Sequence, residues 1–208
     1  MAPRPDIVTT VRPSSSVAGI ILAGGRNSRM GGADKAFLTV GGRTVFERTF
    51  DTLTACFPQV VVVSNDPQKY RGFDVQVVAD EFPRQGPLAG IHAGLGRIDS
   101  PYAFVVACDM PFLQPAPIRF LVSHLNSQDA VIPEWDGDIE PLHGIYGAHL
   151  RPVISEALRT GTRAIRDLLP RLRVQFIPEH LMRRVQGAEE SFRNVNTPEE
   201  AARFDVHA

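Results

Sequence analysis

The segment from Leu22 to Lys35, LAGGRNSRMGGADK, combines four glycines with three basic side chains. Gly24 and Gly25 let backbone N–H groups approach a ligand closely, and Arg29 and Lys35 can neutralise the charge of a polyphosphate. The segment contains neither the G-x-x-x-x-G-K-[ST] phosphate loop nor the dinucleotide pattern G-x-G-x-x-G. It therefore predicts an anion-binding loop of another kind, with a flexible surface loop as the alternative.

Two carboxylates, Asp80 and Asp109, each follow a predicted buried strand. Proteins typically bind Mg²⁺ through one or two carboxylates together with phosphate oxygens of the substrate, so Asp109 alone is sufficient for a metal site. Asp80 precedes the loop Gly86–Gly90, GPLAG, whose backbone can approach a flat base closely. The alternatives are structural, with Asp109 capping the following turn and Asp80 serving as a turn or N-cap acid.

Arginine supplies 20 of the 22 basic residues, and Lys35 and Lys69 are the only lysines. One hypothesis is that a retained lysine marks a site that needs a compact ammonium group rather than a planar guanidinium. Arginines are dense between Arg159 and Arg193. They indicate either solvated helix faces or the approach of a second anionic substrate.

The 208-residue chain has a formal net charge of -1 and 43% apolar residues. This balance excludes a global electrostatic attraction to nucleic acid or to an anionic membrane, so an anion site must be local. Cys56 and Cys108 form no metal-ligand pattern, and such sparse cysteine usage indicates a reducing cytoplasm. We expect residues 1–16 to be a flexible tail that is neither a signal peptide nor a membrane anchor, and residues 17–208 to be a single domain.

Apolar patterning predicts an alternation of buried strands and amphipathic helices. We expect strands at 17–22, 59–64, 74–79 and 102–107, with helices at 44–57, 88–98 and 115–125 between and after them. Later strands are expected at 130–132, 141–146 and 173–177, later helices at 151–158 and 163–169, and a terminal helix from the capping Thr197 to about 204. The fold class is α/β, a three-layer α/β/α arrangement around a doubly wound, mostly parallel, Rossmann-like sheet.

Polar residues collect after the strands of this predicted sheet. Ligands of open parallel sheets bind in the crevice beyond the carboxyl ends of the strands. The glycine-rich loop follows the first strand, Asn65 the second, Asp80 the third and Asp109 the fourth. Glycines, cations, an amide and two acids are therefore expected at one rim of the sheet.

Five motifs, in this order between Leu22 and Glu200, resemble the MobA family of bacterial molybdenum cofactor guanylyltransferases. They are LAGGRNSRMGGADK, GPLAGI, CDMPF, EPLHGIY and NVNTPEE. The first motif is typical of the broad nucleotidyltransferase superfamily, whereas LAGG with RMGG-x-DK, GPLAG and NVNTPEE is similar to the MobA family within it. Related cytidylyltransferases usually carry LAAG, so Gly24 favours guanine.

The resemblance implies that the terminal phosphate of molybdenum-molybdopterin attacks the α-phosphate of Mg-GTP, giving the guanine dinucleotide cofactor and pyrophosphate. By the same resemblance Arg29, Lys35 and Asp109 are the catalytic residues. Nucleotide contacts are implied for Leu22, Ala23, Gly24, Gly25, Lys35, Asp80 and Asp109, an Mg²⁺ contact for Asp109, and pterin contacts for Asn194 and Asn196. Transient contacts with molybdenum-insertion proteins and recipient molybdoenzymes are also implied.

Two alternatives stay open at this point. One is a cytidylyltransferase or sugar-phosphate nucleotidylyltransferase of the same fold, and the other is a nucleotide-binding regulatory module without catalysis. Some members of the family place a ligand asparagine where this chain has Val63, and Asn65 follows two residues later. Whether Asn65 takes over that contact is left open by the sequence.

Overall fold

The computed structural model describes residues 16–24, 35–195 and 197–205. The strands are β1 (Val17–Leu22), β2 (Thr39–Val40), β3 (Arg43–Thr44), β4 (Val60–Val63), β5 (Gln76–Val78), β6 (Tyr102–Ala107), β7 (Ala130–Trp135), β8 (Asp138–Ile139), β9 (His143–Gly147) and β10 (Val174–Ile177). The α-helices are α1 (Val45–Cys56), α2 (Pro87–Leu95), α3 (Pro115–Ser123), α4 (Arg151–Arg159), α5 (Ile165–Leu168), α6 (Glu179–Met182), α7 (Ala188–Ser191) and α8 (Pro198–Asp205). Short 3-10 turns are η2 (Lys35–Phe37), η3 (Pro67–Tyr70), η4 (Ala148–Leu150) and η5 (Leu169–Arg171).

The main sheet has the strand order β10-β7-β9-β6-β1-β4-β5, with β8 paired to β7. Strands β6, β1, β4 and β5 are parallel to one another, and β10 is parallel to β7. Strand β9 runs antiparallel between β6 and β7. The predicted mostly parallel sheet is therefore confirmed, with one reversed strand inside it.

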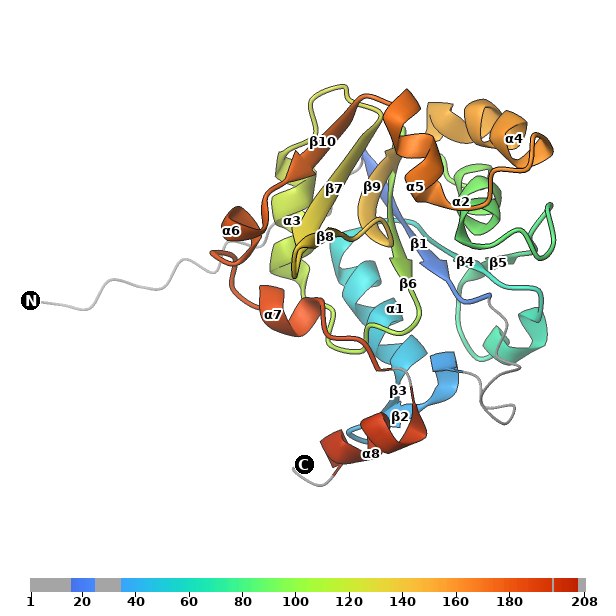
Figure 1. Cartoon of the computed structure of the whole chain (residues 1–208). Coiled ribbons are helices and arrows are strands. Elements are labelled where there is room, and N and C mark those ends of the chain that lie inside the picture. The colour runs from blue at the N-terminus through green and yellow to red at the C-terminus, as the bar shows by residue number, and fades with distance from the viewer. Residues whose placement is uncertain (1–15, 25–34, 196, 206–208) are drawn as a thin grey trace, which may run out of the picture.

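Helices cover both faces of the sheet, as Figure 1 shows, with α1 and α3 on one face and α2, α4 and α5 on the other. The α1 face buries Phe46, Leu53 and Ile118 against the sheet. On the other face Leu88 and Ile154 are completely buried. Continuous burial of β1 on both sides explains its uninterrupted apolar sequence, VAGIIL. The three-layer α/β/α fold predicted from the sequence is thus confirmed.

Helix α1 forms where the 3.6-residue spacing predicted it. Thr44 caps its amino end by accepting a hydrogen bond from the Glu47 N–H, while the Glu47 carboxylate accepts from the Thr44 N–H, which completes a capping box. The helix ends at Cys56 because Pro58 cannot continue it. Helix α1 is consequently fixed at its amino end, next to the rim of the sheet.

A small third core lies beside that rim. Val40, Val45, Val195 and Ala201 are buried together, and they belong to the β2–β3 hairpin, α1 and the segment that enters α8. Figure 1 shows α8 against this hairpin, away from the faces of the main sheet. The hairpin was not predicted from the sequence, because its strands have only two residues each.

The predicted tail, residues 1–16, falls outside the described residues except for Ser16. Within the part of the chain that the structure describes, no helix is both long and apolar enough to cross a lipid bilayer.

Candidate functional site

The first residues after β1 and β6 are hydrogen-bonded to the carboxyl ends of the neighbouring strands. Ala23 donates its N–H to the Val63 carbonyl oxygen at 3.0 Å, and Cys108 donates to the Leu22 carbonyl oxygen at 3.3 Å. Leu22 and Ala23 are buried, whereas Gly24 is exposed at the surface of the rim. The backbone therefore turns outward at Gly24, where an approaching ligand meets main chain rather than side chain.

Two glycines shape the amino end of α2 beside this loop. Gly86 has φ 78° and ψ -168°, a conformation that is essentially restricted to glycine. A Cβ atom at Gly90 would lie 3.1 Å from Leu22 Cδ2, closer than an ordinary van der Waals contact, so a larger residue there would require the Leu22 side chain to move. These two glycines therefore have a structural cause, and the approach of a flat base to the GPLAG backbone stays a prediction.

Asp80 is held in a tight turn at the end of β5. Its backbone N–H donates to Asn65 Oδ1 at 3.1 Å, and its own Oδ1 accepts the Phe82 N–H at 2.8 Å. Burial raises the pKa of the Asp80 carboxyl, although the Phe82 N–H opposes that effect. Asp80 Oδ1 therefore has the structural role of a turn acid, which was the alternative to a nucleotide contact. Asn65 proves to be a positioning residue for Asp80, which the sequence did not reveal because its partner is fifteen residues away.

Asp109 lies at the centre of the rim, two residues beyond β6. Burial raises the pKa of its carboxyl, and the positive charge of Lys35 opposes this effect. The structure thus brings together two residues predicted to act on phosphate and metal from segments more than seventy residues apart. A carboxyl whose pKa is shifted by burial and by a nearby charge is a candidate functional residue, and carboxylates are ligands that Mg²⁺ uses together with substrate phosphates.

The segment before α8 closes the site on the other side of Asp109. The Val195 N–H donates to the Asp109 carbonyl oxygen at 2.8 Å, and the Val195 side chain is completely buried. Asn194, the preceding residue, is exposed beside this contact. The position predicted for a pterin contact at Asn194 therefore adjoins the predicted metal residue.

Glu140 is a further acid at this rim. It begins the motif EPLHGIY, but no catalytic or binding role was predicted for it from the sequence. Because β9 is antiparallel to β6, the residues before β9 lie at the carboxyl end of β6, and the Ala107 N–H donates to the Leu142 carbonyl oxygen at 3.3 Å. Burial raises the pKa of Glu140; nearby Arg166 lowers it, and Asp109 is among the acids that raise it. The motif alone did not indicate that Glu140 lies at the rim near Asp109.

The electrostatic pattern separates the rim from the rest of the molecule. Burial raises the pKa of Asp80, Asp109 and Glu140, all of which lie at the rim. Hydrogen bonds from nearby groups lower the pKa of four other acids, namely Glu47, Asp129, Asp138 and Glu179. Carboxyl groups whose pKa is raised by burial, because hydrogen bonds do not fully offset the loss of solvent, are characteristic of functional sites.

Several arginines of the last third are ion-paired on the surface. Arg166 binds both carboxylate oxygens of Asp138, Arg173 binds Asp129, and Arg183 contacts Glu179. Arg183 also stacks over Trp135 at 4.4 Å from the ring centroid. These contacts favour the surface interpretation of those arginines over a role with a second anionic substrate.

A cavity of about 440 Å³ opens beside Asp80, between β5 and α2. Ala93 and Arg97 form part of its lining, together with residues 76–81. Neither Lys35 nor Asp109 borders it, so this cavity is distinct from the expected phosphate position.

Three residues predicted for the site, Gly25, Arg29 and Asn196, lie outside the described residues. Within the described ranges, no group of three or more His, Cys, Asp or Glu side chains is arranged to hold a metal ion. Any metal bound here by described side chains would accordingly depend on oxygen atoms of a ligand.

A family model for the MobA-like NTP transferase domain matches residues 19–176. The chain is 40% identical over 192 residues to the molybdenum cofactor guanylyltransferase of Desulfosudis oleivorans, covering 92% of this chain and 95% of that protein. It is 34% identical over 190 residues to a probable molybdenum cofactor guanylyltransferase of Pelotomaculum thermopropionicum, covering 91% and 92%. The crystal structure of molybdopterin-guanine dinucleotide biosynthesis protein A from Archaeoglobus fulgidus superimposes with a TM-score of 0.76 at 28% identity, covering 91% and 97%. The chain therefore belongs to the MobA-like NTP transferase family, as its motifs predicted.

Proposed function

We propose that this protein is a molybdenum cofactor guanylyltransferase, which transfers GMP from Mg-GTP to molybdenum-molybdopterin. An oxygen of the terminal phosphate of the pterin substrate forms a bond to the α-phosphorus of GTP. The bond between the α-phosphorus and the oxygen that bridges to the β-phosphate breaks, and pyrophosphate leaves with that electron pair. The products are the guanine dinucleotide cofactor and pyrophosphate.

The observation that carries this proposal is that Lys35 and Asp109 lie close enough at the rim for the lysine charge to act on the aspartate carboxyl, in a chain 40% identical to a relative of that name. Nucleotidyl transfer demands little covalent chemistry from a protein, and catalysis rests on in-line positioning and on neutralising the charge of the phosphates. Lys35 supplies a compact positive charge for the leaving pyrophosphate. Arg29 would add a second cation from the same loop.

The residues at the rim fit Mg²⁺. This ion prefers oxygen ligands and is commonly held by one or two carboxylates while phosphate oxygens and water complete its shell. Asp109 offers a partly buried carboxylate beside the proposed position of the triphosphate. When bound, Mg²⁺ would neutralise charge on the phosphates, and Asp109 would hold it.

The order of the strands supports a division of the rim into two halves. The nucleotide half is formed by Leu22, Ala23 and Gly24 after β1 and by Asp80 after β5, where Asn65 orients the Asp80 backbone. Asp80 would bind guanosine through the carboxylate oxygen that the Phe82 N–H leaves available. The acceptor half lies across Asp109 and contains Glu140 and Asn194. Gly25 and Asn196 are proposed as contacts from the sequence resemblance alone. The α-phosphorus would sit between the halves, next to Lys35 and Asp109.

We also propose that the reaction takes place in the cytoplasm. Cys56 and Cys108 are not joined in a disulfide bond, which is consistent with a reducing compartment. Transient contacts with molybdenum-insertion proteins and with recipient molybdoenzymes would deliver the pterin and remove the product.

The experiment that tests the function is a pyrophosphate-release assay with molybdate-loaded molybdopterin, Mg²⁺ and each nucleoside triphosphate in turn. We expect release with GTP and little or none with CTP, UTP or ATP. Preference for CTP or UTP would favour another nucleotidyltransferase, and GTP binding without release would favour a regulatory module. Asp109→Asn is expected to lower kcat by about 10² or more; wild-type turnover of this variant would contradict the metal assignment.

A further inference from the structure

Lys35 and Asp109 must keep a fixed separation if they are to act on the same triphosphate. Lys35 begins the 3-10 turn η2 and Asp109 lies in the loop after β6, and neither residue belongs to a strand of the sheet. The amino-terminal half of α1 contacts the segments that carry both residues. This helix is therefore the element through which their relative position can be set.

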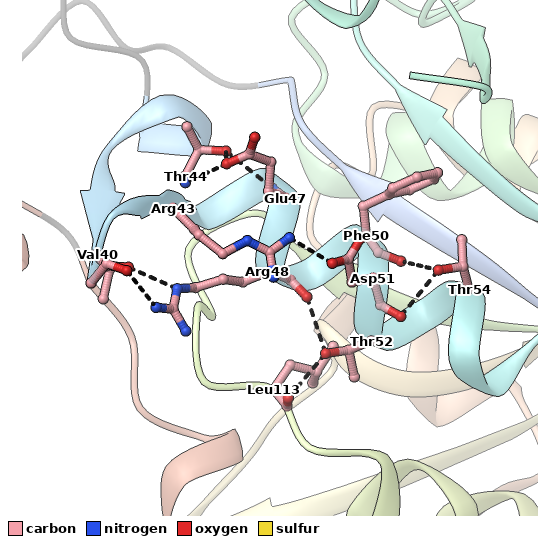
Figure 2. Close-up of polar contacts among 11 residues, drawn as sticks. Val40, Arg43, Thr44, Glu47, Arg48, Phe50, Asp51, Thr52, Thr54 and Leu113 are labelled. Atoms are coloured by element: carbon pink, nitrogen blue, oxygen red, sulfur yellow. Dashed lines mark hydrogen bonds and ion pairs between the residues drawn. The ribbon is translucent and has the colours of Figure 1, made fainter. Parts of the chain in front are cut away.

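On the Lys35 side, hydrogen bonds connect the lysine turn to α1. The Leu38 N–H donates to the Lys35 carbonyl oxygen at 3.2 Å, and the Val45 N–H donates to the Leu38 carbonyl oxygen at 2.9 Å. One turn further along α1, Arg48 donates from Nε to the Val40 carbonyl oxygen at 2.8 Å and from Nη2 to the Gly41 carbonyl oxygen at 3.3 Å (Figure 2). Arg48 thus clamps the β2–β3 hairpin that follows Lys35.

The geometry of this clamp depends on a guanidinium group. Its planar, pre-organised donors reach two successive carbonyl groups at once, which a single ammonium group on a flexible stem does not reproduce. Gly41 has φ 57°, and a Cβ atom there would lie 2.7 Å from Arg48 Nη2. Within the part of the chain that is described, Arg48 makes no ion pair with an acid, so its hydrogen bonds serve the hairpin backbone.

On the Asp109 side, two threonines of the same helix contact the loop after β6. The buried Thr49 hydroxyl lies 3.4 Å from the Met110 carbonyl oxygen. The Thr52 hydroxyl lies 3.3 Å from the Leu113 carbonyl oxygen and 3.0 Å from that of Arg48, as Figure 2 shows. One stretch of α1, residues 45–52, therefore holds the Lys35 segment and the Asp109 loop.

We propose that Arg48 is a positioning residue for the nucleotidyl transfer. It acts through the β2–β3 hairpin to hold Lys35 at the distance from Asp109 that the reaction requires. The inference rests on the proposed function, because it assigns to Lys35 the neutralisation of the leaving pyrophosphate. Without the clamp the hairpin keeps its hydrophobic contacts through Val40 but loses two hydrogen bonds, so the lysine turn samples more positions. Misplacement of a charged group by about 1 Å reduces the rate of an enzyme by up to about a hundredfold.

The test is a double-mutant cycle with Arg48→Gln and Lys35→Ala. We expect Arg48→Gln to lower kcat by on the order of tenfold, and Lys35→Ala by about 10². The double variant should be no slower than Lys35→Ala, because Arg48 has nothing left to position. Multiplication of the two losses would show that Arg48 acts independently of Lys35 and would overturn the proposal, as would wild-type kcat in Arg48→Gln.

The same cycle is measured on the Kd for magnesium pyrophosphate by titration calorimetry. This readout requires no turnover, so it tests the clamp even if the wild-type protein releases no pyrophosphate and the proposed function fails. The matched control is Arg43→Gln, which removes a neighbouring arginine that pairs with the exposed Asp51 (Figure 2). The control should match the wild type in kcat and Kd; a loss equal to that of Arg48→Gln contradicts the proposal.

Arg48→Lys provides a second variant in case Arg48→Gln fails to fold. It retains the charge and can reach one carbonyl group, so its kcat and Kd should lie between those of the wild type and Lys35→Ala. In the Lys35→Ala background Arg48→Lys should have no effect, and an additional loss there would overturn the inference.

Discussion

Replacing Asp129 by asparagine is expected to destabilise the fold and leave the chemistry at the rim unchanged. Asp129 lies at the opposite end of the sheet, just before β7. Its Oδ2 accepts the Arg173 backbone N–H at 2.8 Å, and its Oδ1 lies 2.9 Å from Arg173 Nη2 and 3.0 Å from His149 Nε2. The carboxylate therefore ties the start of β10 to the turn after β9.

The magnitude follows from the pKa of this carboxyl. Hydrogen bonds from the Arg173 side chain and backbone lower the pKa of Asp129 from 3.8 to about 2. At about 1.36 kcal/mol for each pKa unit, this corresponds to about 2.4 kcal/mol of stabilisation at neutral pH. Because the Arg173 side chain is 72% exposed, solvent screening reduces the expected loss in Asp129→Asn to about 1–1.5 kcal/mol.

The assay is urea unfolding of the wild type and Asp129→Asn over a range of pH, with pyrophosphate release measured in parallel. The folded-state pKa is below the unfolded one, so the advantage of the wild type is fully present above about pH 4 and declines as the pH falls toward about 2. A melting temperature lower by about 2–6 °C is expected at neutral pH. Equal stability of the two proteins, or a large change in kcat, would refute this account of the far end of the sheet.

Substitutions at three further positions test individual contacts of the site. Asn65→Ala removes the acceptor for the Asp80 N–H and should raise the KM for GTP about fivefold at unchanged kcat, whereas Asn65→Asp should retain the wild-type KM; the converse ranking of these variants argues against the contact. Thr197→Ala removes the cap of α8, a loss of about 1 kcal/mol, and should raise the KM for the pterin substrate in steady-state assays while the KM for GTP stays constant. Glu140→Gln should raise the melting temperature at neutral pH, because burial raises the pKa of this acid and its charge opposes folding above that pKa. The same variant should raise the KM for the pterin substrate about tenfold; no change in either quantity would remove Glu140 from the acceptor half.

Much of the fold was predictable because its elements are locally encoded. Strand β6 has the predicted bounds, and α1 follows the apolar spacing with Thr44 as its cap. Helix α2 was predicted to continue to residue 98, but it ends at Leu95. Gly96 follows immediately. Ile98 fits the apolar spacing of the helix but lies three residues beyond its end. Periodicity locates helices well, but an apolar residue just beyond the last turn can extend the predicted helix past its observed end.

Sequence reasoning missed one short local element and several features that depend on contacts between distant residues. The β2–β3 hairpin turns at Gly41 and Gly42, both with positive φ, yet its strands are too short to show an alternating pattern. The reversal of β9 is equally invisible, since an apolar run does not encode strand direction. Glu140 and Asn65 acquire their roles only through the tertiary neighbours that the reversed strand and the neighbouring loops bring to them.

The reversed strand β9 has a consequence for how this fold diversifies. The chain reaches the acceptor side through the β7–β8 hairpin, which turns at Asp136 and Gly137 and lies off the main path of the sheet. Insertions or substitutions between Trp135 and Leu142 can alter that side while the connections of β1, β4, β5 and β6 stay as they are. Evolution can thus exchange the molecule that receives the nucleotide without rebuilding the apparatus that activates it.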